Sequence, residues 1–406
     1  MRIGGTFLLV ACLALTAHAG AIKPGPNAQE EIQEALITAK PGATVNLGAG
    51  TFDLQMGLSL DIDRVKLRGK GPDKTILSFK NQNAGSEGLI VTGSGVVLEN
   101  FAVEDSKGDA IKTKGCKGIT FRNVRAEWTG GPKETNGSYG FYPVESENVL
   151  IEKCVAIGAS DAGIYVGQSK NIVVRESRAE YNVAGIEIEN CHGADVYECV
   201  ATKNTGGILV FDMPDLPVQG GRDVRVFNNQ VFDNDTQNFA PKGNIVATVP
   251  TGTGIMIMAN NNVEVFENTL SGNQTTNCLI VSYLASGKEI KDPNYDPYPE
   301  GIFIHSNRFG TGGDNPQGDL GGALSELIGK PVPDIVWDGV IDAKKLVGGE
   351  LPRELRIYIA DNQDADFINF DLMNALSDPS KAKPSRDIAA HAGELPRLKP
   401  IKLARR

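Results

Sequence analysis

The amino-acid sequence predicts an all-β protein, a right-handed parallel β-helix. One 22-residue pattern occurs twice in succession, at residues 162–183 and 184–205. Each copy holds two short strands with apolar residues at alternate positions and no helical pattern between them, which excludes βαβ units. The chain also contains 47 glycines but only 6% aromatic residues. This composition is typical of many tight turns around a slim, β-branched core.

The repeat extends beyond these two copies. A small residue precedes the first strand of each coil, mostly at intervals of about 22 residues, a period typical of a solenoid. These positions are Gly88, Ala110, Gly140, Gly163, Gly185, Gly207, Gly254 and Cys278. Each coil of a solenoid stacks about 4.8 Å from the next. We therefore expect equivalent residues of every coil to point inward.

A second column of equivalent residues follows the second strand of each coil. On the last three coils of the repeat this column holds Asn229, Asn268 and Asn307. Stacked parallel strands place such side chains directly above one another. The sequence therefore predicts an asparagine ladder, in which each amide bonds to the next.

The two ends of the stack need caps, because an open coil exposes unpaired backbone groups. Asn27 and Glu30 predict a capping-box start to a short amphipathic helix. We expect residues 20–43 to form an N-terminal cap and residues 44–310 the parallel β-helix. Residues 311–406 are expected to form a C-terminal cap region with one or two further strands and a tail.

The first 19 residues are typical of a secretory signal peptide. Arg2 precedes an apolar stretch at 7–15, and an A-x-A cleavage site follows at 17–19. We expect an exported monomer, periplasmic or extracellular. A lipoprotein anchor at Cys12 is the less favoured alternative, because the apolar stretch before it would be very short. No later apolar run approaches the length of a membrane span.

Charge and cysteine content exclude some functions. A net charge of -10 argues against a nucleic-acid partner, which requires a basic face. Beyond the predicted cleavage site five cysteines remain, none in a C-x-x-C spacing, so we expect small buried residues rather than a zinc or redox site.

The signal sequence, the helical cap, the segment PGATVNLGAGTFDL and the G-I-x-I and N-V-x-V coils together resemble the pectate-lyase-like β-helix superfamily. Within it, the chain resembles bacterial parallel β-helix repeat proteins of unassigned function. The resemblance covers residues 22–310 and implies the fold rather than one chemistry. Members include uronan lyases, polygalacturonases, mannuronan C5-epimerases and a non-catalytic accessory protein of nitrous-oxide reductase assembly. The G-H-G and D-P-H-D signatures of two of these enzyme groups are absent.

The outward positions of the first strands form a candidate saccharide site. Stacking of the coils is expected to place Tyr142, Tyr165 and Glu187 in one line. Aromatic rings flanked by carboxylates and lysines are typical of a groove that binds sugars. The expected substrate-binding residues are Tyr142, Tyr165, Lys114 and Asp161, and the expected catalytic residues are Glu187, Glu189 and Lys112.

These residues suit two kinds of reaction. Glu187 and Glu189 lie two positions apart on one strand, about 7 Å, which suits an inverting hydrolase. In a lyase or epimerase, Lys112 would take a proton beside a substrate carboxylate neutralised by a cation. Calcium held by Asp161 and Asp212 is the candidate cofactor. The structural alternatives are a solvated array of charges and, for Asp212, a hydrogen bond within its own turn.

The sequence thus predicts an exported protein that binds or modifies a polysaccharide, and leaves open whether it is an enzyme. The alternative is a non-catalytic periplasmic scaffold or assembly accessory protein that docks a partner protein. Its docking surface would be the apolar outward strip from Leu209 to Met258. Three insertions interrupt the repeat, at 128–138, 212–221 with 238–253, and 284–300. The last two follow unusually apolar outward strands and are expected to cover them.

Overall fold

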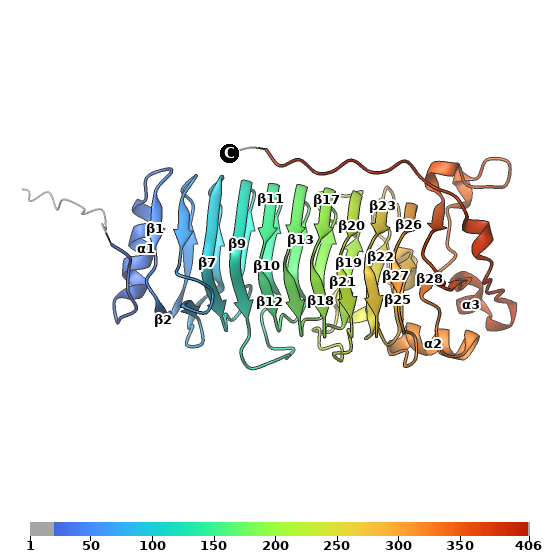
Figure 1. The fold of residues 1–406 in the computed structure, drawn as a ribbon, viewed down its shortest axis with the longest axis horizontal. Helices are drawn as coiled ribbons and strands as arrows, with labels where there is room; N and C mark the ends of the chain where they lie inside the picture. Colours follow the sequence, from blue (N-terminus) through green and yellow to red (C-terminus); the bar gives the residue numbers. More distant parts are fainter. Residues whose placement is uncertain (1–19, 405–406) are drawn as a thin grey trace, which may run out of the picture.

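The coils stack along a single axis in the computed structural model, which describes residues 20–404 (Figure 1). Two long parallel sheets run the length of this stack. The arrangement confirms the predicted parallel β-helix, with a helix at the N-terminal end and irregular segments at the C-terminal end.

One sheet is eleven-stranded and holds the first strand of each coil. Its register follows the repeat, since Ile164 pairs with Ile186, which pairs with Ile208. Its strands are β3 (Met56–Leu60), β6 (Ala84–Val91), β8 (Ile111–Lys114), β10 (Tyr139–Val144), β13 (Ala162–Gly167), β16 (Ala184–Glu189), β19 (Gly206–Phe211), β22 (Thr253–Met258), β25 (Thr276–Val281), β28 (Ile335–Trp337) and β30 (Phe367–Asn369).

The other sheet is nineteen-stranded, because most coils contribute two short strands to it. Its strands are β1 (Thr44–Asn46), β2 (Gly50–Asp53), β4 (Lys66–Arg68), β5 (Thr75–Ser78), β7 (Val96–Glu104), β9 (Lys117–Glu127), β11 (Glu147–Glu152), β12 (Val155–Ile157), β14 (Lys170–Arg175), β15 (Arg178–Glu180), β17 (His192–Tyr197), β18 (Val200–Thr202), β20 (Arg222–Phe227), β21 (Gln230–Phe232), β23 (Asn261–Phe266), β24 (Thr269–Ser271), β26 (Glu300–His305), β27 (Arg308–Phe309) and β29 (Ile357–Ala360).

Helices are few. They are α1 (Ala28–Thr38), α2 (Gly318–Ile328) and α3 (Leu372–Ser377), with 3-10 turns η1 (Ile245–Thr248), η2 (Tyr283–Ser286), η3 (Ala343–Lys345), η4 (Arg353–Leu355), η5 (Pro379–Lys381) and η6 (Ile388–His391). Over residues 20–404, none is long and apolar enough to cross a membrane.

The N-terminal helix is present as predicted, but its capping box is not. Ile32 and Leu36 of α1 are fully buried against the first coils, which closes that end of the core. Asn27 makes no side-chain capping bond, because its φ of -101° and ψ of 6° lie outside the extended conformation that aims a capping side chain at the helix. Only its carbonyl caps the first turn, accepting from the Glu31 N–H.

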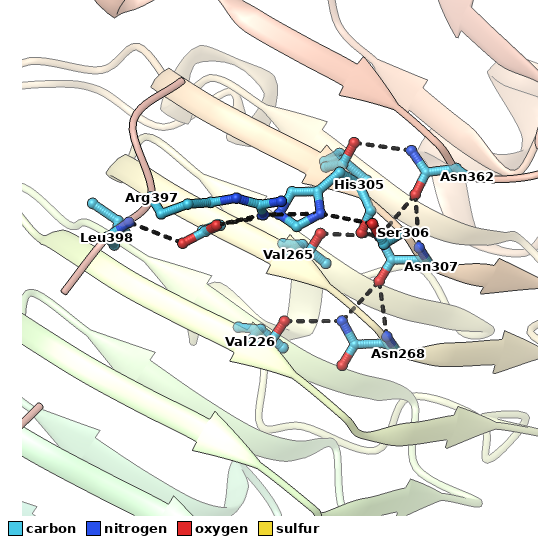
Figure 2. Close-up of polar contacts among 11 residues, drawn as sticks. Val226, Val265, Asn268, His305, Ser306, Asn307, Asn362, Arg397 and Leu398 are labelled. Atoms are coloured by element: carbon cyan, nitrogen blue, oxygen red, sulfur yellow. Dashed lines mark hydrogen bonds and ion pairs between the residues drawn. The ribbon is translucent and has the colours of Figure 1, made fainter. Parts of the chain in front are cut away.

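The asparagine ladder is confirmed, and it is longer than predicted (Figure 2). The side-chain amide of Asn229 donates to Asn268, which donates to Asn307, which donates to Asn362, each at 2.9 to 3.0 Å. A second ladder links Asn182, Asn204, Asn234, Asn273 and Asn277 at another corner of the coils. Apart from the bond from Asn273 to Asn277, which lie four residues apart, each of these bonds joins neighbouring coils and so fixes the register of the stack.

The five cysteines of the described chain are all buried and unpaired, as expected. Four of them have pKa values raised to about 12 by burial. They therefore act as small core residues and not as nucleophiles or metal ligands.

Candidate functional site

The predicted line of side chains exists on the outer face of the eleven-stranded sheet. Lys112 of β8 pairs in register with Tyr142 of β10. Tyr165 of β13 pairs in register with Glu187 of β16. Because β10 and β13 are themselves neighbours, the four residues occupy consecutive coils. Tyr165 and Glu187 are only 4% and 1% exposed, so the part of this line that a ligand can contact is the end at Lys112 and Tyr142.

Glu187 is buried, so the alternative of a solvated charge array is wrong for it. The residue is only 1% exposed, and its Oε2 has no hydrogen-bond partner. Burial raises the pKa of Glu187 well above its usual value, and the nearby carboxyls of Glu189 and Asp161 raise it further. Burial thus favours the protonated form of Glu187, and its Oε2 has no structural partner.

Three tyrosines pack beside this acid. The ring centroids of Tyr139, Tyr142 and Tyr165 lie 4.4 to 5.1 Å apart. The Tyr165 hydroxyl donates to Glu189 at 2.6 Å. Gly167 permits this contact, because a Cβ at that position would overlap the Tyr165 ring.

Asp161 lies beneath the insertion at residues 238–253. The Asn244 amide of this insertion donates to Asp161 Oδ2 at 2.8 Å. The insertion is held in shape by Asn238, whose amide donates to the carbonyls of Val246 and Val249 at 2.9 Å. Asn244 and Asp161 are 83 positions apart in the sequence. A distant segment of the chain therefore closes one side of the site.

We define the carboxyl cluster as Asp109, Asp161, Glu187 and Glu189. Burial raises the pKa of Asp161 and of Glu189 to about 7, and that of Asp109 to about 6. Like charges contribute as well, since Glu189 raises the pKa of Asp161. Such a group of buried acids, titrating near neutral pH, can donate and accept protons under ordinary conditions.

The cluster has an open edge at Lys112. The Lys112 ammonium lies 3.6 Å from Glu87, 3.9 Å from Asp109 and 4.8 Å from the centre of the Tyr142 ring. The side chains of Lys112 and Glu87 are about a quarter exposed, at 25% and 24%. A ligand would thus reach the cluster past Lys112 and the face of Tyr142.

Lys114 does not join the cluster. It points outward, with 55% of its side chain exposed, and pairs with Glu145 at 3.4 Å. Its predicted role in substrate binding therefore has no support from its position, although it stands two residues from Lys112 on the same strand.

Asp212 takes the structural alternative foreseen for it. Its Oδ1 accepts the Gly221 N–H at 2.6 Å and closes the turn between them. No group of three or more His, Cys, Asp or Glu side chains within residues 20–404 converges as a metal site. Asp161 and Asp212 instead accept hydrogen bonds from Asn244 and Gly221, and this arrangement does not bring them together as calcium ligands.

Sequence reasoning missed Tyr139, Asn244 and Glu87. Tyr139 begins β10, one position before the small residue that marks the coil, where the repeat predicts no functional side chain. Glu87 and Asn244 lie outside the alternating outward positions. Asp109 lies three residues before Lys112 in the sequence, and the ion pair between them shows that it faces the same site.

The apolar strip from Leu209 to Met258 is not a free docking surface. Leu209, Phe211, Met256 and Met258 are at most 4% exposed. Residues of the insertions, among them Val246, Val249, Tyr283 and Tyr295, pack on them as a second core. The Tyr295 hydroxyl also donates to the Asp212 carbonyl at 2.6 Å, which ties two insertions together. The scaffold alternative thus loses the surface on which it depended.

The fold is shared with known proteins. A family model described as a right handed beta helix region matches residues 69–220. The A-module of a mannuronan C-5 epimerase from Azotobacter vinelandii has a TM-score of 0.56 at 16% identity, over 85% of this chain and 93% of the module. An alginate lyase from Paenibacillus has a TM-score of 0.48 at 17% identity, over 73% of this chain and 98% of the lyase. No curated protein matches the sequence. At such identities the likeness is one of fold.

Proposed function

We propose that this right-handed parallel β-helix protein belongs to the pectate-lyase-like superfamily, binds a polysaccharide along the outer face of the eleven-stranded sheet and modifies it by proton transfer. The carboxyl cluster supplies the acid and base, and the open edge at Lys112 receives the substrate. We further propose that the protein is exported, on the strength of residues 1–19, which lie outside the described residues.

The observation that carries the proposal is a cluster of four carboxyls beside three tyrosines, in which Glu187 and Asp161 are buried and Asp109 and Glu189 are half-buried. Lys112 is the cation beside Asp109, and Glu187 Oε2 has neither a cation nor a hydrogen bond. Buried acids in this arrangement cost stability, since burial and mutual repulsion oppose their ionisation. Groups that destabilise a fold and titrate near neutral pH are typical of sites that do chemistry.

Each residue has a role in this proposal. Glu187, whose raised pKa favours the protonated acid, donates a proton to the sugar, and Glu189, with a pKa of about 7, exchanges a proton with substrate or water. Tyr142 lies against a sugar ring, and Lys112 binds a hydroxyl or carboxylate of the incoming chain. The carboxyl pair suits hydrolysis of a glycosidic bond. A protonated acid beside a substrate carboxylate equally suits a lyase or an epimerase.

Uronans are one class of candidate substrate. The epimerase module that shares the fold is named for mannuronan, and Lys112 offers a positive charge to a uronate at the open edge. Neutral glycans are another, because the carboxyls around Lys112 repel polyanions when they are ionised.

Lys112→Ala is expected to weaken binding of the recognised oligosaccharide at least tenfold, because it removes the one charged donor at the open edge. Isothermal titration calorimetry across a panel of uronan and neutral oligosaccharides, with and without calcium, measures this. Lys114→Ala is the matched control, since Lys114 lies on the same strand but pairs away from the site, and its affinity is expected to equal that of the wild type. Equal losses in both variants would contradict the placement of the site.

Binding of a uronan is expected to weaken as the pH rises from 5 to 8. Below pH 6 the carboxyls of Asp161 and Glu189 are protonated and neutral, since burial raises their pKa values to about 7. Above pH 7 they ionise and repel a polyanion, whereas binding of a neutral oligosaccharide feels no such repulsion. The same titrations at pH 5 and pH 8 measure the difference. A uronan affinity that is unchanged or greater at pH 8 would exclude these carboxyls from the binding site.

A further inference from the structure

The C-terminal segment, residues 394–404, extends away from the C-terminal cap that precedes it. From η6 it runs as an extended chain back along the stack, over the outer face of the nineteen-stranded sheet (Figure 1). Pro396 and Pro400 fix their own φ angles and restrict the residues before them to extended conformations. The segment is therefore already shaped as a polyproline-type ligand.

Three backbone N–H groups of the segment bond to side chains of the sheet at a regular spacing. Leu398 N–H donates to Glu264 at 3.1 Å, Ile401 N–H to Asp195 at 3.0 Å, and Ala404 N–H to Asn148 at 3.4 Å. These acceptors belong to β23, β17 and β11, which alternate with β20 and β14 in the stack. Two coil steps span about 9.6 Å, and three extended residues span about 9 to 10 Å. The period of the segment thus matches the period of the coils.

The side chains repeat with the same period. Leu395, Leu398 and Ile401 are half-buried, whereas the residues between them are exposed. The Ile401 side chain lies against Gly193, where an added Cβ would be 3.0 Å from its Cδ1. From Leu395 to Ile401 one apolar residue in three faces the sheet, as expected for an extended threefold helix, whereas the half-buried Leu403 falls outside this spacing.

Arg397 anchors the start of the segment (Figure 2). Its guanidinium pairs with the buried Glu264 at 2.8 Å and lies 5.2 Å from the centre of the Phe303 ring. It also contacts the ring nitrogens of His305, which is 2% exposed. Burial lowers the pKa of His305 to about 4, and the charge of Arg397 adds to this, so at neutral pH the imidazole is uncharged and accepts from the guanidinium.

The sheet supplies the complementary surface. Glu264 and Asp195 are each 3% exposed, so the two carboxyls that receive the segment are built into the face. Beside them, stacked rings of Tyr197, Phe227, Phe266 and His305 form a flat row, with centroids 4.8 to 5.1 Å apart. A basic, proline-containing segment meets acidic acceptors and aromatic rings, which is the chemistry of polyproline recognition.

We propose that the outer face of the nineteen-stranded sheet is a peptide-binding site, and that the chain's own C-terminal segment is its ligand, held in cis. The site recognises an extended basic segment with X-Pro pairs and an apolar residue at every third position. It lies on the opposite sheet from the carboxyl cluster, so the proposal is independent of the proposed function.

Because the segment occupies the site of its own chain, its occupancy sets the affinity expected for the same peptide supplied separately. A tethered ligand has an effective concentration of about 1 mM, so a segment bound more than nine-tenths of the time requires a Kd below about 0.1 mM. The same peptide supplied separately is therefore expected to bind a chain whose own segment has been released. It is expected to bind the wild type at least tenfold more weakly, because the site is already filled.

The test uses the full chain carrying Leu398→Asp and Ile401→Asp. Each new carboxylate lies beside the acceptor that holds the segment, Glu264 or Asp195, so like charges release it. Hydrogen exchange of residues 394–404 reports the release. A labelled synthetic peptide of residues 393–406 is then titrated by fluorescence anisotropy into this variant, into the wild type and into a control, Lys399→Ala with Lys402→Ala, whose substituted side chains are exposed.

The expected result is a Kd below about 0.1 mM for the released variant alone. A peptide of scrambled order is expected not to bind, and Glu264→Gln in the released variant is expected to lower the affinity about tenfold. Three outcomes would overturn the proposal: no binding to the released variant at 1 mM peptide, equal binding of the scrambled peptide, or a segment that stays protected from exchange in the double variant. The last outcome would mean that other contacts hold it.

Discussion

Glu187→Gln is expected to lower kcat/KM for the polysaccharide by about 10² to 10⁴-fold, because it removes the proton that the proposal assigns to this acid. The glutamine keeps the shape of the side chain and the packing around it. The loss is expected mainly in kcat, since Lys112 and Tyr142 still hold the sugar. Turnover of the substrate identified in the panel measures both parameters. A variant with wild-type kcat would exclude Glu187 from the chemistry.

The same substitution is expected to stabilise the fold at neutral pH. The folded-state pKa of Glu187 is raised above 4.5, so the unfolded chain ionises first as the pH rises. From about pH 4.5 upward the wild type then loses up to about 1.4 kcal/mol of unfolding free energy per pH unit relative to the variant, until the folded acid ionises. Denaturant unfolding at pH 4 and pH 8 measures this.

The control for that experiment is Glu147→Gln. Glu147 has 36% of its side chain exposed and a distant partner in Lys170 at 4.0 Å. The unfolding free energy of the Glu147→Gln variant is expected to equal that of the wild type at both pH values, within about 0.5 kcal/mol. A Glu187→Gln variant that is less stable than the wild type at pH 8 would show that the carboxylate serves the fold.

Asn268→Ala is expected to destabilise the β-helix by about 3 to 5 kcal/mol. Asn268 accepts from both the backbone and the side-chain N–H of Asn229, and its own amide donates to Val226 and Asn307. Alanine leaves these buried partners without replacements, because water does not reach the ladder, where Asn268 is fully buried. Chemical denaturation measures the change.

Asn81→Ala provides the comparison for the ladder. Asn81 is an exposed asparagine that bonds only to the side chain of Asp53, at 3.1 Å. Its loss is expected to cost less than about 0.5 kcal/mol. Similar effects of the two substitutions would mean that the ladder adds little beyond packing.

The repeat made the stacked parts of the fold predictable. Because each coil must present the same residues to its neighbours, alignment of the sequence with itself was enough to place Tyr165 against Glu187 and Asn229 against Asn268. Residues in contact on neighbouring coils are 22 to 39 positions apart in the sequence, as in the bonds of the two asparagine ladders. Local periodicity carries that information.

Contacts made by the insertions and the C-terminal segment could not be predicted from the repeat. The bond from Asn244 to Asp161 and that from Ile401 to Asp195 join residues 83 and 206 positions apart. In each bond one partner, Asn244 or Ile401, lies outside the repeating columns, so no pattern pairs it with the other residue. Val246 and Val249 of the insertion that bonds to Asp161 pack over this part of the sheet, where an outward position in the repeat holds the buried acid Glu187.

The most direct test of the proposed chemistry is a proton NMR time course in D₂O of uronan and neutral glycans incubated with the protein. We predict that one glycan changes with the wild type and stays unchanged with Glu187→Gln. Olefinic signals would identify a lyase, exchange of the proton beside the carboxylate an epimerase, and new reducing ends a hydrolase. Spectra that stay unchanged with the wild type across the whole panel, or that change equally with Glu187→Gln, would contradict proton transfer by the carboxyl cluster.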